Sequence, residues 1–169
     1  MTDMTLHSLL GDPAMAGDWT LLPDRSSIRF TNKTMWGLIP VNGHFTAVNG
    51  HAHVGGDGSV TGRLVIRADS VKTGIGKRDK HLCSADFFDA ETYPEIVVEI
   101  SGPEPAATLT VRGITRPLGL SITALRQDAG TVAVSARGRI DRTAWGVSGN
   151  MLGMIPPTTT LEADAVFAR

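Results

Sequence analysis

The sequence contains a single cysteine, few aromatic residues, no long hydrophobic run and no excess of charge of either sign. Cys83 has no second cysteine to pair with, which excludes an intramolecular disulfide and a zinc site built on two or more thiolates. The formal charge of -1 at pH 7 provides no surplus of cations for a phosphate backbone, so we expect no nucleic-acid partner. Aromatic residues make up 5% of the chain, which argues against the aromatic girdles of a transmembrane barrel.

The N-terminal segment lacks the features of an export signal. Residues 1–19 contain no Lys or Arg, carry three aspartates and include no apolar run of the length that a signal peptide needs. No stretch of the chain approaches the roughly 18 to 20 apolar residues of a membrane-spanning helix. We therefore expect a cytoplasmic protein that does not span a membrane.

Residues that favour strands and turns are abundant. Thr, Val and Ile make up about a quarter of the chain, and Gly and Pro are frequent. Apolar and polar residues alternate with a period of two in segments about ten residues apart, as in antiparallel strands with one buried face. The clearest of these segments are residues 60–67, 95–101, 109–111, 118–124, 132–140 and 161–167.

This pattern predicts an all-β fold, an antiparallel β-barrel of about 8–10 strands whose interior holds side chains or a small ligand. Residues 73–82 are the exception, because they are rich in charge and do not alternate. We expect one short helix there, followed by a loop over residues 83–94. Residues 1–17 are interpreted as an N-terminal lead-in and residues 18–169 as the barrel domain.

Ionisable side chains outside the strands concentrate in residues 78–89. A carboxylate beside an imidazole can orient a general base, so Asp79 and His81 are the candidates for an enzyme. Residues two apart on a helix do not face each other, and we interpret both as structural residues that hydrogen-bond at the helix-to-loop junction. Cys83 is interpreted as a buried, inert thiol rather than a nucleophile.

Three histidines form the only arrangement that suggests a metal. His51 and His53 point to one face of a strand, and His44 precedes a turn that we expect at residues 48–50. Three imidazoles can bind zinc and leave an open position. Histidines are also common on solvated strands, and no neighbouring carboxylate is indicated. We therefore expect no metal site and no catalytic constellation.

A series of motifs between about residues 18 and 168 resembles the YceI-like family. The longest reads RDKHLCSADFFD at residues 78–89 and is followed by Tyr93-Pro94. The motifs before and after it, in order, are SIRF at 27–30, WGL at 36–38, VNGHF at 41–45, LTVRGITRP at 109–117, and Asp141-Arg142 ahead of Trp145-Gly146.

The resemblance implies an extended lipocalin-like barrel whose apolar interior holds a polyisoprenoid, such as an isoprenoid quinone or a polyprenyl phosphate. It implies binding or carriage of this lipid, with no cofactor and no catalytic residue. At about 0.8 kcal/mol per buried CH₂, even four isoprene units outweigh an association cost on the order of 4 to 15 kcal/mol.

The expected wall of the cavity consists of Phe30, Phe45, Phe87, Phe88 and Ile96. Two adjacent phenylalanines in a loop are expected to diverge, one packing between helix and barrel and the other reaching the mouth of the cavity. The alternative to a lipid-binding protein is an enzyme that acts on an apolar substrate through Asp79 and His81. The sequence leaves open whether two copies of the chain form a homodimer.

Overall fold

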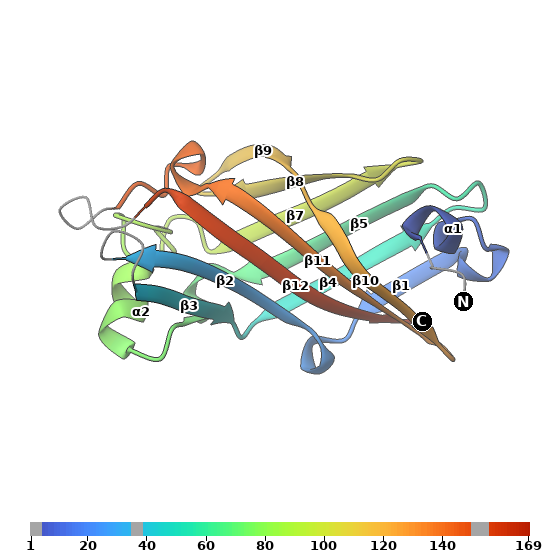
Figure 1. Cartoon of the computed structure of the whole chain (residues 1–169), viewed down its shortest axis with the longest axis horizontal. Coiled ribbons are helices and arrows are strands. Elements are labelled where there is room, and N and C mark those ends of the chain that lie inside the picture. The colour runs from blue at the N-terminus through green and yellow to red at the C-terminus, as the bar shows by residue number, and fades with distance from the viewer. Residues whose placement is uncertain (1–4, 35–38, 150–155) are drawn as a thin grey trace.

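A computed structural model describes residues 5–34, 39–149 and 156–169. Its strands form one antiparallel sheet of twelve strands, which curves around a common interior (Figure 1). The predicted all-β class is confirmed, and the strands are more numerous than expected. One of the two α-helices, α2, spans Gly76–Leu82 and therefore begins three residues later than the predicted helix.

The elements are named in chain order. The helices and single 3-10 turns are α1 (Leu6–Leu10), η1 (Pro13–Met15), η2 (Pro23–Arg25), η3 (Ala68–Ser70), α2 (Gly76–Leu82) and η4 (Arg142–Trp145). The strands are β1 (Gly17–Leu21), β2 (Ser27–Thr34), β3 (Ile39–Phe45), β4 (Val48–Val54), β5 (Val60–Arg67), β6 (Val71–Lys72), β7 (Glu95–Gly102), β8 (Ala106–Val111), β9 (Ile114–Leu118), β10 (Ser121–Asp128), β11 (Thr131–Asp141) and β12 (Thr158–Ala168).

Strand β12 connects the two halves of the sheet. One of its edges pairs with β11 along its length, and the other pairs first with β2 and then, at its C-terminal end, with β1. From β1 the sheet continues through β4, β5, β7 and β8 to β9, while β2 leads to β3 and β6. The first and last strands of the chain, β1 and β12, thus lie side by side (Figure 1).

The hydrogen-bonded ladder does not close into a complete ring, although the strand count favoured closure. Among the described residues β9 pairs only with β8, and β10 pairs only with β11. Pro117 in β9 has no N–H to donate, and proline within a sheet is confined to edge strands. The chain passes from β9 to β10 without forming a ladder between them, so both are edge strands.

The predicted continuous strand over residues 118–124 is wrong in its second half. Leu118 and Leu120 line the interior, whereas Ile122 and Ala124 are exposed. Ile122 pairs with the cavity-lining Ala136 and is exposed because β10 is an edge strand. The β10–β11 register shifts after Ile122, and the extra residue in one strand turns Ala124 to the other side of the sheet. Leu125, rather than Ala124, consequently packs against buried residues.

Two hydrophobic clusters stabilise the fold. The larger lines the inside of the sheet around β5, β7, β8 and β12, and the smaller lies at the end that carries α1. In the smaller cluster Leu9, Leu10 and Met15, from the segment expected as a lead-in, are buried beside Trp19. The Trp19 indole Nε1 donates a hydrogen bond to the Met15 carbonyl oxygen at 2.9 Å. Helices α1 and α2 lie at opposite ends of the molecule (Figure 1).

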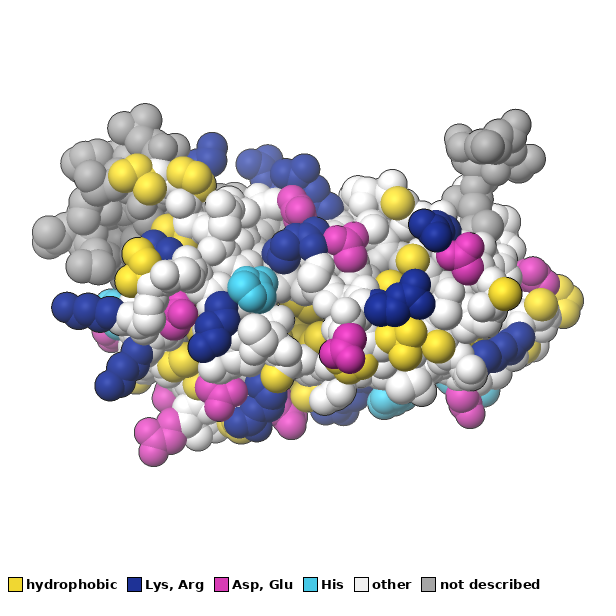
Figure 2. Space-filling model, turned by 90° about the horizontal axis from the view of Figure 1, so that it is seen from below, with side chains coloured by type: hydrophobic (Ala, Val, Ile, Leu, Met, Phe, Trp, Pro, Cys, Tyr) yellow, Lys and Arg dark blue, Asp and Glu magenta, His cyan; other side chains and the backbone are white. Residues whose placement is uncertain are grey.

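Figure 2 shows charges of both signs over the face seen from below, with apolar side chains between them. In the part of the chain that the structure describes, no helix has the length and apolar character needed to cross a bilayer.

Gly43 provides a test of the β2–β3 register. It lies directly opposite Phe30, and a Cβ at Gly43 would collide with the Phe30 ring. We expect Gly43→Ala to displace the ring and lower the free energy of unfolding by about 1 to 3 kcal/mol in denaturant titrations. Gly62→Ala is the control, because its Cβ would meet its neighbours only at ordinary contact, 3.5 Å from the Cβ of Ala52. Equal stability of the two variants would contradict the packing of Phe30 over Gly43.

Candidate ligand-binding cavity

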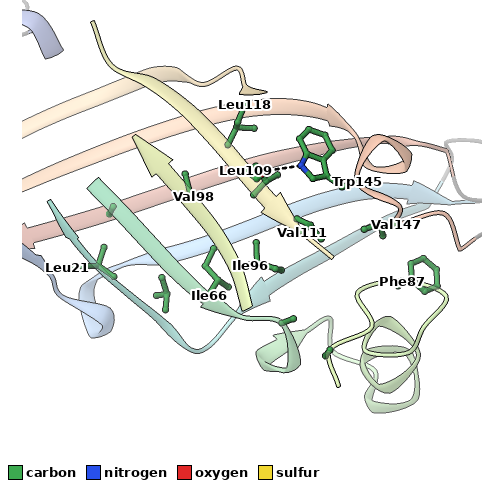
Figure 3. Packing of buried hydrophobic residues seen from close by; sticks show 14 residues of the cluster. Leu21, Ile66, Phe87, Ile96, Val98, Leu109, Val111, Leu118, Trp145 and Val147 are labelled. Atoms are coloured by element: carbon green, nitrogen blue, oxygen red, sulfur yellow. Dashed lines mark hydrogen bonds between the residues drawn. The ribbon is translucent and has the colours of Figure 1, made fainter. Parts of the chain in front are cut away.

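The sheet surrounds an apolar cavity of about 420 Å³. This volume lies within the range of small-molecule sites, so the interior is not packed solid by side chains. Side chains of β5, β7 and β8 converge on the same interior space (Figure 3). The aliphatic part of the wall includes Ile28, Leu64, Ile66, Val98, Leu109, Val111, Leu118, Leu120, Ile140 and Leu161.

Small residues on β11 and β12 help to keep this space open. Ala136 and Ala163 are direct partners in the β11–β12 ladder, and both line the cavity. Partners in an antiparallel ladder point to the same side of the sheet, so the two methyl groups face the interior together. Larger side chains at these positions would occupy the volume that is open.

All five residues predicted for the wall line the cavity: Phe30 on β2, Phe45 on β3, Ile96 on β7, and Phe87 and Phe88 in the loop after α2. Three of the rings form a row, because the centroids of Phe30 and Phe45 are 5.7 Å apart and those of Phe45 and Phe88 are 5.8 Å apart. The structure thus places Phe30, Phe45 and Phe88 together on one wall of the cavity. Contact of any of the five predicted residues with a ligand stays a prediction.

The adjacent rings of Phe87 and Phe88 have different surroundings. Phe87 is 6% exposed, and its ring meets the His81 imidazole edge-on at a centroid distance of 5.2 Å. The Arg142 guanidinium lies 5.9 Å from the centroid of the same ring. Phe88 is only partly buried and packs on Phe45 instead. Phe87 therefore joins α2 to η4, and Phe88 faces β3.

The cavity opens at the end of the molecule that carries α2. Ile39 at the start of β3 and His81 on α2 line the cavity and are also exposed to solvent, which marks its mouth. Arg142 of η4 also lines the cavity and is buried, with its Nη1 donating to the Val147 carbonyl oxygen at 2.5 Å. Burial lowers the pKa of Arg142 from its ordinary value. Arg142 belongs to one of the family motifs, but the sequence alone does not show that its side chain is buried at the cavity wall.

Asp79 and His81 do not form an acid/base pair. The Asp79 carboxylate accepts hydrogen bonds from the Thr73 backbone N–H at 2.8 Å and from its hydroxyl at 2.5 Å. His81 Nε2 lies instead 3.3 Å from the Asp86 carboxylate. Asp79 thus holds the segment before α2, as a structural residue does, and the two side chains have separate partners.

Cys83 ends α2 and is only partly buried. Burial, with a smaller contribution from the nearby carboxylates of Asp69 and Asp79, raises the pKa of its thiol. A raised pKa disfavours the thiolate, which is the nucleophilic form. The structure therefore gives Cys83 none of the activation expected of a catalytic cysteine.

Acid should remove the contribution of Asp79 to stability. Its hydrogen bonds from Thr73 hold the pKa of the carboxyl below its ordinary value of 3.8. A lowered folded-state pKa stabilises the fold above the ordinary pKa, and this contribution is lost as the pH falls through the lowered value. Asp79→Asn should consequently melt below the wild type at pH 7 and approach it as the pH falls below the ordinary carboxyl pKa of 3.8 and through the lowered value. A gap in melting temperature that persists unchanged in acid would contradict this role.

The three histidines considered for zinc do not converge. The turn predicted at residues 48–50 is wrong, because β4 begins at Val48 and residues 46–47 make the connection. His53 Nδ1 lies 2.7 Å from the Asp18 carboxylate, and His44 stands on β3 opposite Arg29. Over residues 5–34, 39–149 and 156–169, no group of three or more His, Cys, Asp or Glu side chains is placed to hold a metal ion.

The fold and the cavity together define an antiparallel β protein built around an apolar, small-molecule-sized interior. The chain belongs to the YceI-like family, whose model, described as a YceI-like domain, matches residues 19–167. This confirms the resemblance carried by the sequence motifs. One of these motifs, WGL at 36–38, lies outside the described residues.

Curated relatives match over a shorter region. Protein YceI of Escherichia coli O157:H7 is 39% identical over 64 residues, which cover 34% of each chain. The UPF0312 protein plu2095 of Photorhabdus laumondii is 37% identical over 65 residues, again 34% of each chain. The chain thus aligns with about a third of the length of these relatives.

Two solved structures resemble the whole domain. BcnA of Burkholderia cenocepacia aligns with a TM-score of 0.73 at 18% identity, over 86% of this chain and 98% of its own. A polyisoprenoid binding domain from Saccharophagus degradans aligns with a TM-score of 0.74 at 18% identity, over 89% and 97% of the two chains. At this identity the likeness establishes the shared fold.

Proposed function

We propose that this protein binds the apolar chain of an isoprenoid lipid inside its cavity and carries it. The observation that supports this most directly is the 420 Å³ cavity walled by aliphatic and phenyl side chains. Burial of an apolar chain against such a wall drives binding without any catalytic group. The polyisoprenoid named for the Saccharophagus degradans domain, which shares the fold, supports the same class of ligand.

We infer that the site binds rather than reacts. Asp79 and His81, the residues on which an enzyme would depend, bond to Thr73 and Asp86 respectively and not to each other. The ligand class expected from the family resemblance is an isoprenoid quinone or a polyprenyl phosphate, with the tail in the interior and the head group toward α2. A cytoplasmic location remains a prediction.

A chain-length series tests the proposal. Prenyl alcohols with two, three and four isoprene units should bind with increasing affinity, by at least tenfold per unit until the cavity is full, because each buried carbon contributes about 0.8 kcal/mol. Isothermal titration of the purified protein gives the dissociation constants. An affinity that does not depend on chain length, or no binding of any member, would overturn the proposed function.

A further inference from the structure

A buried polar pair, Asn32 and Thr159, interrupts the apolar wall near the mouth of the cavity. Asn32 is on β2, and its side chain faces the interior together with Ile28 and Phe30, which alternate with it and also line the cavity. It pairs with Val41 on β3, two residues from the exposed Ile39. The amide therefore lies about 7 Å along the strand from the solvent end.

The hydrogen bonds of Asn32 are incomplete. It is 9% exposed, and its Nδ2 donates to the Thr159 hydroxyl at 2.9 Å. Thr159 is buried at 7% exposure and lines the cavity as well. The Asn32 Oδ1 is buried and accepts no hydrogen bond from the described residues. A buried acceptor without a partner carries a desolvation cost, which a ligand that donates a hydrogen bond to it would remove.

Small-molecule sites are largely apolar and contain a few polar groups that orient the ligand. Asn32 and Thr159 are such a pair, and they form the one place in this stretch of wall where a ligand can add a missing hydrogen bond. The Arg78 and His81 side chains at the same end already have partners in their own chain. Arg78 donates to the Thr73 carbonyl oxygen at 2.7 Å, and His81 lies beside Asp86.

We propose that Asn32 and Thr159 bind a hydroxyl group at the head of the isoprenoid. A hydroxyl donates to Oδ1 as the amide stands. If the amide turns about χ2, Thr159 donates to Oδ1 and the hydroxyl accepts from Nδ2, so a hydroxyl fits both orientations. A quinone carbonyl or a fully ionised phosphate only accepts, so it fits the turned amide alone and leaves Oδ1 without a donor in the other orientation.

The ligand class that fits both orientations is a hydroxyl-terminated isoprenoid, either a prenyl alcohol or the reduced hydroquinone form of an isoprenoid quinone. This inference rests on the proposed function, since the hydroxyl reaches Asn32 only if the chain occupies the cavity. From Asn32 the chain extends toward Leu64, Val98 and Leu109, which form the apolar wall beyond the mouth.

The experiment compares ligands that share one tail. Geranylgeraniol, its methyl ether and geranylgeranyl diphosphate are titrated into the wild type and into Asn32→Val. The wild type should bind the alcohol about fivefold to tenfold more tightly than the ether, as expected for one net hydrogen bond. Asn32→Val should bind both equally, with the affinity for the ether retained.

A wild type that binds alcohol and ether equally would overturn the hydroxyl site and leave the proposed function intact, whereas failure of all three ligands would overturn the proposed function itself. Tighter binding of the diphosphate than of the alcohol would also overturn the hydroxyl site.

A second comparison needs no variant. The hydroquinone and quinone forms of one isoprenoid quinone are titrated into the wild type, where the hydroquinone should bind more tightly and equal binding would contradict the site. Whichever of the alcohol and the hydroquinone binds more tightly then assigns the source of the hydroxyl.

Discussion

Replacing Phe87 with alanine should lower the free energy of unfolding by roughly 3 to 5 kcal/mol. Its ring is 6% exposed and contacts three separate parts of the chain, the His81 imidazole, the Arg142 guanidinium and the backbone near Gly149. Truncation leaves a cavity between α2 and η4 that the surrounding loops can only partly fill. Denaturant titration of the purified variant measures the loss.

Phe88→Ala is the matched comparison. Phe88 is less buried and packs on Phe45 at the cavity wall, so its truncation should lower stability less and should speed the release of a bound prenyl chain. The two variants would then show that Phe87 contributes to packing and that Phe88 contributes to retention of the ligand. If neither substitution alters the ligand off-rate, the loop after α2 does not control release of the ligand, and neither phenylalanine is a binding residue.

Replacing Ala163 with phenylalanine should abolish lipid binding and preserve the fold. The ring would enter the space left by Ala163 and its ladder partner Ala136, and it would exclude several carbons of the ligand. At about 0.8 kcal/mol per excluded carbon, affinity should fall by a hundredfold or more. Stability should change little, because the ring fills open volume rather than occupied space.

Ala124→Phe is the control for this substitution. Ala124 is exposed on the edge strand β10, so the same added ring there lies outside the cavity. It should bind geranylgeraniol as the wild type does. Unchanged affinity in Ala163→Phe, measured with a wild-type melting temperature, would show that the ligand binds elsewhere.

Much of this fold follows from local pattern. The alternation in β5, β7 and β12 predicts the strands, because a strand with a wet face and a dry face has a period of two. Val97 on β7 and Val166 on β12 interrupt the alternation and are buried as well. Local charge without alternation likewise predicts α2. The start of that helix was misplaced by three residues because Asp79 binds back to Thr73 and holds residues 73–75 outside it.

Features that depend on long-range register were not predictable. The shift near Ile122 has no signature in the sequence, and it changes which residues of β10 face inward. The apposition of Ala136 and Ala163 depends on the pairing of β11 with β12, which no single segment specifies. Asn32 stands among polar neighbours in the sequence, Thr31 and Lys33, so only the strand register reveals that it faces the cavity.

The candidate wall was predictable for a different reason. Large apolar rings are rarely left in water, so the phenylalanines of the family motifs were expected inside, and all of those named line the cavity. Their alignment into a row from Phe30 through Phe45 to Phe88 required the β2–β3 pairing and the fold of the loop after α2.

Native mass spectrometry of the protein purified from its own host, followed by organic extraction of what it holds, tests the proposed function most directly. The wild type should carry a bound species that dissociates on activation and whose extracted mass corresponds to an isoprenoid lipid, and Ala163→Phe, expressed in the same host, should carry none. Wild-type protein free of lipid that also fails to bind added geranylgeraniol, or an extracted ligand without an isoprenoid chain, would contradict the proposed function.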